Sequence, residues 1–544
     1  MPPFMRSSKR TFVHQALTVV ATVGAFAAPA RAVEPWPPST PPGADTTSAE
    51  VKPRAPAPPP PPVVVVEPPP VAVVPPPAVV APPPVAVAPP PVAVEPRAPA
   101  PTRASEGSDA TVLRAAPLET SREAFTYGTL DGQLFLRTRR DELVLLPSAE
   151  LALDALSRPT GNRGTYDAAS LSRARLDVRG WVFSKAYFNL AADFASGPSL
   201  RHVDNFVAVA PWGDRVIFQA GQFDAPFTLE NRTSDRYLDL VDRGAAVRAF
   251  AIPENKDQGV MVHGTNPARN FYYSAGVFNG EGPSVKGVDS RLDVMARGWV
   301  APFSFRDPDA LHDITLGGSV WTGDRSAGPV FAGQTTQAGY SVLDPSVWWT
   351  TGPMSPLVVR EQGRLSAVAV ELNAPFAHRF GARFEWIGKR QPFSAFDVTN
   401  AARPQLVAGL NLAGWATYAE LWGWVLGDDR ILGAPAAPGL ELPARYRDLR
   451  DAAPRGGLML AARLDYVDET MTPGPAAKMN GLGVSSGGAT KLTALTFGAT
   501  YWYTRRARLN VNYVLNRFEG TTPYLNGIES KSEQEIIIRT ALAL

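Results

Sequence analysis

Arginine is the residue type through which this sequence could act chemically. The chain of 544 residues has no cysteine and five histidines, and no two histidines have the spacing of metal ligands. A disulfide, a thiolate zinc site and a cysteine nucleophile are therefore excluded. The sequence also lacks an H-E-x-x-H motif, a P-loop and a G-x-S-x-G nucleophile turn. We expect no catalytic residue, no metal, no cofactor and no enzymatic activity.

The arginines recur at every second position of short segments. In residues 172–183, Arg173, Arg175 and Arg179 alternate with Leu176 and Val178. A period of two is typical of a β-strand with one apolar and one polar face. The same alternation recurs in residues 185–196, 290–300, 379–387, 506–516 and in the last run of the chain. The pattern predicts about 16 strands, give or take two.

The polar faces of these strands carry more arginines than acids. Parity assigns to the inner face Arg173, Arg175, Arg179, Arg215, Arg291, Arg297, Arg379, Arg383, Arg463, Arg506, Arg508 and Arg539. The acids assigned to the same face are Asp177, Asp193, Asp293, Glu385 and Asp465. If this face lines a pore, an excess of arginine favours anions. The alternative is that each arginine pairs with an acid and braces the wall.

Two kinds of fold could position such faces, a soluble sandwich or a transmembrane barrel. Three features favour an all-β, antiparallel transmembrane barrel. The segments have the length that a tilted strand needs to cross a bilayer. Aromatic residues gather at strand ends, as in an interfacial girdle: Trp181, Trp299, Trp321, Trp348, Trp349 and Tyr501–Tyr503. The chain also ends inside a strand, which would close the barrel.

The connections between strands are predicted to alternate in length. Ser184 and residues 211–213 and 504–505 have the composition of tight turns, whereas residues 224–257, 323–362 and 427–455 are long. Outer-membrane barrels place short turns in the periplasm and long loops outside. We therefore expect the three long connections at the outer end.

The N-terminal part of the chain predicts export and a linker. A basic start, an apolar run and Ala30-Arg31-Ala32 indicate a signal peptide over residues 1–32. Proline recurs through residues 33–103, which predicts an extended periplasmic linker. Residues 104–130 would connect this linker to a barrel over residues 131–544. The net charge of +2 argues against a nucleic-acid partner.

One string of residues resembles a known family. Gly221-Gln222-Phe223-Asp224-Ala225-Pro226-Phe227-Thr228-Leu229-Glu230 is similar to a segment of the phosphate-selective porin O and P family. The resemblance implies a trimeric, 16-stranded outer-membrane channel. It also implies that the following loop, residues 231–257, folds into the pore. Arg236, Arg243 and Arg248 would then contact anions at the constriction, and residues 233–235 could cap a short helix through Val241.

The function predicted from these features is passive diffusion of small hydrophilic solutes, with a preference for anions such as phosphate. The expected partners are outer-membrane lipid, two further copies of the chain and small anionic solutes. The alternative is a structural role, in which the barrel anchors the proline-rich arm and the arm tethers the outer membrane to the cell wall. The arm would then bind peptidoglycan or a periplasmic protein.

Overall fold

The computed structural model describes most of the chain beyond residue 124. The described residues are 125–130, 133–158, 166–183, 185–195, 201–252, 255–284, 291–304, 311–325, 334–336, 341–342, 345–349, 357–397, 405–432, 456–473, 482–486, 490–519 and 531–543. The predicted signal peptide and linker lie outside these residues. Within the described part of the chain, the helices are all too short or too polar to cross a bilayer.

Strands make up nearly all of this structure. The strands that form its wall are β3 (Leu143–Arg158), β4 (Tyr166–Val182), β5 (Ala186–Asp193), β6 (Arg201–Val209), β7 (Ile217–Asp224), β8 (Lys256–Thr265), β9 (Phe271–Phe278), β10 (Asp293–Val300), β11 (Thr315–Arg325), β16 (Gly363–Phe376), β17 (Phe380–Asp397), β18 (Gln405–Leu426), β19 (Gly457–Pro473), β21 (Lys491–Thr504), β22 (Ala507–Glu519) and β23 (Ser532–Ala543).

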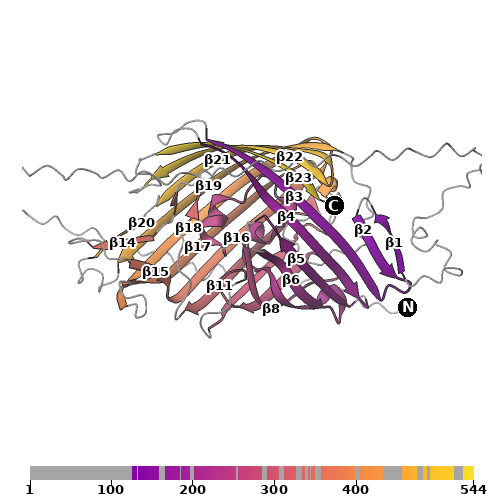
Figure 1. Ribbon diagram of the computed structural model, residues 1–544, viewed down its shortest axis with the longest axis horizontal. Helices are drawn as coiled ribbons and strands as arrows, with labels where there is room; N and C mark the ends of the chain where they lie inside the picture. The colour runs from indigo at the N-terminus through magenta and orange to yellow at the C-terminus, as the bar shows by residue number, and fades with distance from the viewer. Residues whose placement is uncertain are drawn as a thin grey trace, which may run out of the picture. The chain divides into compact units, whose positions relative to one another are not determined.

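These strands form a closed ring. Each pairs antiparallel with its neighbour along the chain, and β23 returns to pair with β3, with Ala541 opposite Ala152. The ring is an antiparallel barrel of 16 strands. In Figure 1 the tilted strands run side by side from β3, in indigo, to β23, in yellow. The predicted fold class and strand number are confirmed.

The apolar faces of the strands point out of the ring. Leu176 is 59% exposed, Val207 55% and Leu421 66%, although all three lie within paired strands. A soluble sandwich would bury such residues against a second sheet. A wall with an apolar outside and a polar inside suits a barrel surrounded by lipid.

The predicted aromatic girdle is partly wrong. Tyr501 and Tyr503 face outward, at 40% and 56% exposure. Trp181, Trp299, Trp321 and Trp502 are instead buried, on the inward-facing positions of their strands. The reason is parity, since each lies an even number of residues from an inward-facing polar residue of its own strand. The side chains of Trp348 and Trp349 lie outside the described residues.

The two ends of the barrel differ in their connections. At the short-turn end, β4 and β5 are joined by residues 183–185, β16 and β17 by 377–379, and β21 and β22 by 505–506. The connections 225–255 and 326–356 lie at the opposite, long-loop end. Residues 427–456 are long but lie at the short-turn end, because Trp424 N donates to Arg379 O and Asp429 N to His378 O. The expectation that this connection lies with the other long loops is wrong.

Further strands extend the ring or lie on its connections. β1 (Phe125–Leu130) and β2 (Gln133–Thr138) form a hairpin, and β2 pairs with the start of β3. β15 (Leu357–Glu361) directly precedes β16 and pairs with the continuation of β17. Gly363 lies between the paired parts of β15 and β16, and its φ of +99° suits glycine. β12 (Gln334–Thr335) pairs with β13 (Ser341–Val342), and β14 (Pro345–Trp349) with β20 (Leu482–Ser486). The domain limits drawn from the sequence stay a prediction.

Candidate functional site

The connection between β7 and β8, residues 225–255, folds into the barrel; we call it the inward segment. It contains α2 (Leu229–Arg232), the 3-10 turn η3 (Asp235–Tyr237) and α3 (Ala245–Phe250). Ser234 caps η3 by accepting from Arg236 N, and η3 ends at Tyr237. The predicted helix through Val241 is therefore wrong, because the chain leaves the helical conformation at Leu238 and bends through residues 239–242 before α3 begins.

The start of the inward segment is fixed on the wall beside β7. The Thr228 hydroxyl accepts from Asn231 N, and Thr228 N donates to the Ser319 hydroxyl on β11 at 3.0 Å. The Glu385 carboxylate on β17 accepts from Leu229 N and Glu230 N. A carboxylate satisfies the free N–H groups at a helix start. The positive φ of Thr228, +63°, lets the chain turn inward here.

The middle of the inward segment reaches the opposite wall. Arg508 on β22 donates to the carbonyls of Asp235 and Arg236, at 2.9 and 2.7 Å. Arg539 on β23 donates to Val241 O at 2.7 Å. One segment therefore contacts strands on both sides of the ring. Only a chain that crosses the lumen can make both sets of contacts.

Apolar contacts fix both the start of the inward segment and α3 in the lumen. Phe227 packs edge-on against Trp321 of β11, with 5.6 Å between ring centroids. Phe250 is fully buried, in one cluster with Leu410 and Leu412 of β18. A Cβ at Gly414 would lie 2.8 Å from the Phe250 ring, so this position of β18 must be glycine for the ring to fit. The inward segment gives the inner wall a hydrophobic core that a water-filled tube would lack.

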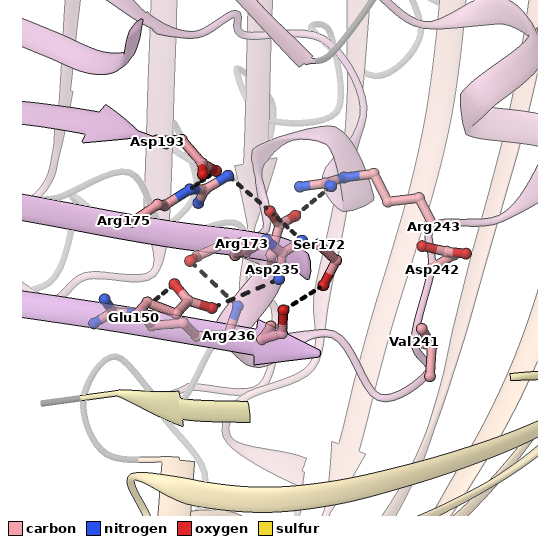
Figure 2. Close-up of polar contacts among 12 residues, drawn as sticks. Glu150, Ser172, Arg173, Arg175, Asp193, Asp235, Arg236, Val241, Asp242 and Arg243 are labelled. Carbon is pink, nitrogen blue, oxygen red and sulfur yellow. Dashed lines mark hydrogen bonds and ion pairs between the residues drawn. The ribbon is translucent and has the colours of Figure 1, made fainter. Parts of the chain in front are cut away.

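Asp235 of the inward segment is the centre of a cluster of arginines (Figure 2). It pairs with Arg173 at 2.6 Å and Arg175 at 3.5 Å, both on β4, and with Arg243 of its own segment. Burial alone would raise the pKa of Asp235, but the charges of Arg173, Arg243 and Arg175 hold that pKa well below its usual range. Asp235 is therefore ionised at neutral pH and ties the inward segment to β4.

Arg236 makes the neighbouring contacts of this cluster. Its guanidinium donates to Glu150 at 3.1 Å and to the Ser148 hydroxyl at 3.1 Å, both on β3, and lies 3.6 Å from Asp177. The Arg236 side chain is more exposed than those of the acids, at 25% against 3% for Glu150 and 13% for Asp177. The side chain of Arg175 is likewise more exposed than that of its partner Asp193, at 22% against 5%.

A second cluster joins the inward segment to β18 and β19. Arg463 pairs with Glu230 at 3.0 Å, with Asp465 at 3.0 Å and with Glu420 at 3.5 Å. Glu230 also accepts from Gly244 N at 2.7 Å, at the start of α3. Burial raises the pKa of Glu230, and Arg463 and the Gly244 N–H oppose this increase. Acids outnumber arginines here, so this wall is not basic.

The structure places the predicted residues in three environments. Arg215, Arg379 and Arg506 lie in turns, and Arg291 precedes β10 and pairs outside the wall with the exposed Asp324. The prediction that these four line the lumen is wrong, because parity does not hold beyond a strand's end. The remaining predicted arginines on strands all have inward positions: Arg173, Arg175, Arg179, Arg297, Arg383, Arg463, Arg508 and Arg539. Arg236 and Arg243 lie in the clusters above, and Arg248 lies in the last turn of α3.

Sequence reasoning missed many of the acids that face these arginines. Glu371 binds Arg297 at 2.7 Å, Asp154 binds Arg539 at 2.6 Å, and Asp239 and Glu420 bind Arg383. With these acids included, the inner wall does not have the arginine excess that parity indicated. Their alternation is a usable signal on β16, where Glu371 lies between the outward Val370 and Leu372. On the inward segment no period exists, so only the fold reveals Asp235 and Asp239.

A short turn enters the lumen from the other end. The 3-10 turn η6 (Asp429–Leu432) follows β18, and Asp429 binds His378 Nδ1 at 2.9 Å. Ile431 is fully buried in a cluster with Leu240 of the inward segment and with the inward indoles of Trp422, Trp424 and Trp502. The inward segment and η6, which enter from opposite ends of the barrel, therefore narrow the lumen beside β18 and β21.

A closed barrel with an apolar exterior and an inward-folded loop defines a class, the membrane-spanning β-barrels of the porin type. Residues 151–306 match the model of the family described as "Phosphate-selective porin O and P", which confirms the predicted resemblance to that family.

Known proteins with likeness to the chain include Porin O of Pseudomonas aeruginosa. The two are 27% identical over 231 residues, which cover 36% of this chain and 52% of the relative, so the chain spans about half the length of that curated protein. Among solved structures, an anion-selective porin from Comamonas acidovorans aligns with a TM-score of 0.43 at 10% identity, over 74% of this chain and 100% of that one. The outer membrane channel DcaP of Acinetobacter baumannii aligns with a TM-score of 0.41 at 11% identity, over 75% of this chain and 99% of that one.

Proposed function

We propose that this chain is an outer-membrane porin through which small hydrophilic solutes diffuse passively. The observation that carries the proposal is the inward segment, which spans the lumen of a closed barrel and is held by ion pairs on both sides. A purely structural barrel has no need of a charged loop across its interior. A loop of this kind narrows a pore and brings charged groups to the path of a solute.

The proposal includes a weak to moderate preference for anions, phosphate among them. The support is local, because the side chains of Arg175, Arg179 and Arg236 are more exposed than those of Asp193, Asp177 and Glu150, with which they pair. A passing ion therefore meets Arg175, Arg179 and Arg236 before it meets their partners. Arginine presents a planar fork of donors that fits phosphate and carboxylate groups.

Planar-bilayer recordings test both parts of the proposal. The folded full chain should give stepwise conductance, and its reversal potential in a salt gradient should indicate more anion than cation flow. The double change Arg179→Gln and Arg236→Gln should move the reversal potential toward cations. The double change Arg215→Gln and Arg379→Gln removes the same charge at exposed turn residues, so it is the matched control and should leave the reversal potential unchanged. A folded barrel without conductance would refute the porin.

We further propose that the porin is a homotrimer, as the family resemblance implies, and that its short-turn end faces the periplasm. The proposed tether rests on residues 33–103, outside the described part of the chain, and no observation within that part favours it.

A further inference from the structure

Three arginines lie together on the outside of the barrel, near its long-loop end: Arg360 on β15, Arg364 on β16 and Arg390 on β17. On β16 the flanking Leu365 is buried, and on β17 the flanking Gln391 is buried. Strand alternation therefore turns Arg364 and Arg390 away from the lumen, and both are exposed. Arg360 has the same outward parity and is half-buried.

The register of the sheet makes these arginines neighbours. Arg390 is opposite Ser366, so Arg364 is its diagonal neighbour on β16. Residues in that relation lie about 7–8 Å apart, and their Cβ atoms are somewhat closer. Arg360 follows on the same row, opposite Ser394 of β17. Two guanidinium groups at this spacing can reach one phosphate from either side.

The arginines lie directly above the apolar part of the wall. Below Arg364 on β16, Val368 and Val370 face outward, at 37% and 47% exposure. On β17, the ring of Trp386 lies along the wall beside Gly388, where a Cβ would be 2.8 Å from it. Trp415 of the next strand is opposite Gly388 and 40% exposed.

The depth of these aromatic rings in the membrane indicates the depth of the arginines. Outward tryptophans are enriched at the boundary between the hydrocarbon core and the lipid headgroups. Arg390 is four residues beyond Trp386, which is about 13 Å along the strand. Because the strands are tilted, the rise along the membrane normal is smaller than this. Arg364 and Arg390 therefore lie at the headgroup level, where phosphates are found.

No described carboxylate pairs with these three arginines. The outward acid opposite Arg364, Asp324, binds Arg291 at 2.6 Å instead. Lys491, an outward lysine at the same end, also has an acidic partner, since it binds Asp468 at 3.3 Å. Unlike Arg291 and Lys491, the arginines of β15–β17 can therefore pair with an anionic group outside the chain.

We propose that Arg364 and Arg390, with Arg360, form a binding site for the phosphate of a membrane lipid, with the lipid's acyl chains against Val368, Val370 and Trp386. Phosphate matches the charge and the fork geometry of paired arginines. The apolar strip below the arginines fits a ligand that carries chains as well as a phosphate. A dissolved anion on its way through the pore would not meet this outer face. In the orientation of the proposed porin, the lipid is a phosphorylated glycolipid of the outer leaflet.

Native mass spectrometry of the full chain in detergent tests this site. The probes are bis-phosphorylated lipid A, the same lipid without its phosphates, and inorganic phosphate alone. The double change Arg364→Gln and Arg390→Gln should weaken binding of the phosphorylated lipid about tenfold or more, since each basic residue near an anionic lipid contributes about 1 kcal/mol. The wild-type chain should bind the dephosphorylated lipid as weakly as this variant binds the phosphorylated one.

The control variant, Arg215→Gln with Arg379→Gln, removes the same charge at exposed turn residues of the opposite end and should bind like the wild type. Equal binding of both lipids by the wild-type chain, which needs no variant, would overturn the proposal. Wild-type affinity in the double variant would do so too. Loss of lipid binding in excess inorganic phosphate would show that the site takes a free anion instead. The readout is independent of conductance, so it stands or fails separately from the porin function.

Discussion

At the scale of single residues, Asp235 is the charge that fixes the inward segment. It lies in the loop but faces Arg173 and Arg175 of β4 and Arg243 of its own segment. Removing one member of a buried ion-pair network leaves the other charges without compensation. One anchor of the segment is therefore a carboxylate that no strand pattern marks.

We predict that Asp235→Asn destabilises the folded barrel by on the order of 3 kcal/mol. The measurement is the urea midpoint of the refolded chain in lipid vesicles. Asp324→Asn is the control, because Asp324 is 58% exposed in its pair with Arg291 and exposed pairs contribute about 1 kcal/mol or less. Equal midpoints for the two variants would contradict the role assigned to Asp235.

The pKa of Asp235 also predicts a pH dependence. Its folded pKa is depressed, so its contribution to stability is complete above the unfolded pKa, about 3.9, and is lost as pH falls through the folded pKa. We expect channel currents of the wild type to be steady between about pH 5 and 7 with respect to this group. Below about pH 4 the segment should loosen, with noisier currents; Asp235→Asn should show this noise at neutral pH.

At the scale of elements, α3 is held by packing more than by its own helix propensity. It has six residues, too few for a stable isolated helix. Phe250 inserts beside Gly414 of β18, and Phe227 packs on Trp321 of β11. These contacts bury aromatic surface in what would otherwise be an open pore.

We predict that Phe250→Ala releases α3 and increases single-channel conductance. Truncating a buried phenylalanine costs about 3–5 kcal/mol, which is enough to shift a docked loop toward its undocked state. Phe384→Ala is the control, since Phe384 faces outward on β17 at 38% exposure. The heat-dependent shift in gel mobility that is typical of folded barrels should persist in both variants. An unchanged conductance in Phe250→Ala would mean that α3 does not limit the pore.

At the scale of the whole molecule, the barrel closes without a disulfide and without a metal ligand set among the described residues. The continuous ladder from β3 to β23 leaves no unpaired edge within the ring. Its outer face is apolar, so outside a membrane it needs detergent or lipid to stay in solution.

We predict that the purified chain behaves as a trimer of such barrels. Mass measurement of the detergent-solubilised protein should give three copies, and bilayer recordings should show three equal conductance steps that appear and disappear together. A single step with the mass of one copy would contradict the proposed trimer while leaving the single-barrel porin intact.

The sequence alone determined the strands and their faces. Period two is local, so Arg173, Arg175 and Leu176 reveal a strand, and the face on which each lies, without any knowledge of neighbours. The repetition predicted about 16 strands, and the strand length, the aromatic residues and the terminal strand favoured a barrel. The string 221–230 also identified the loop that enters the lumen.

Only the tertiary structure decided which charges meet. Glu150 and Arg236 are 86 residues apart in the sequence, and the inward segment has no period from which to place Asp235. The inward segment packs against Leu410 and Leu412 on the inner face of β18, so the inward positions of this strand are apolar there. The assumption that every inward position is polar is wrong at these two residues. Arg215 and Arg379 kept the parity of the inner face but lie past the strand ends. A periodic pattern fixes the direction of a side chain only while the ladder continues, whereas its partners depend on what the closed barrel encloses.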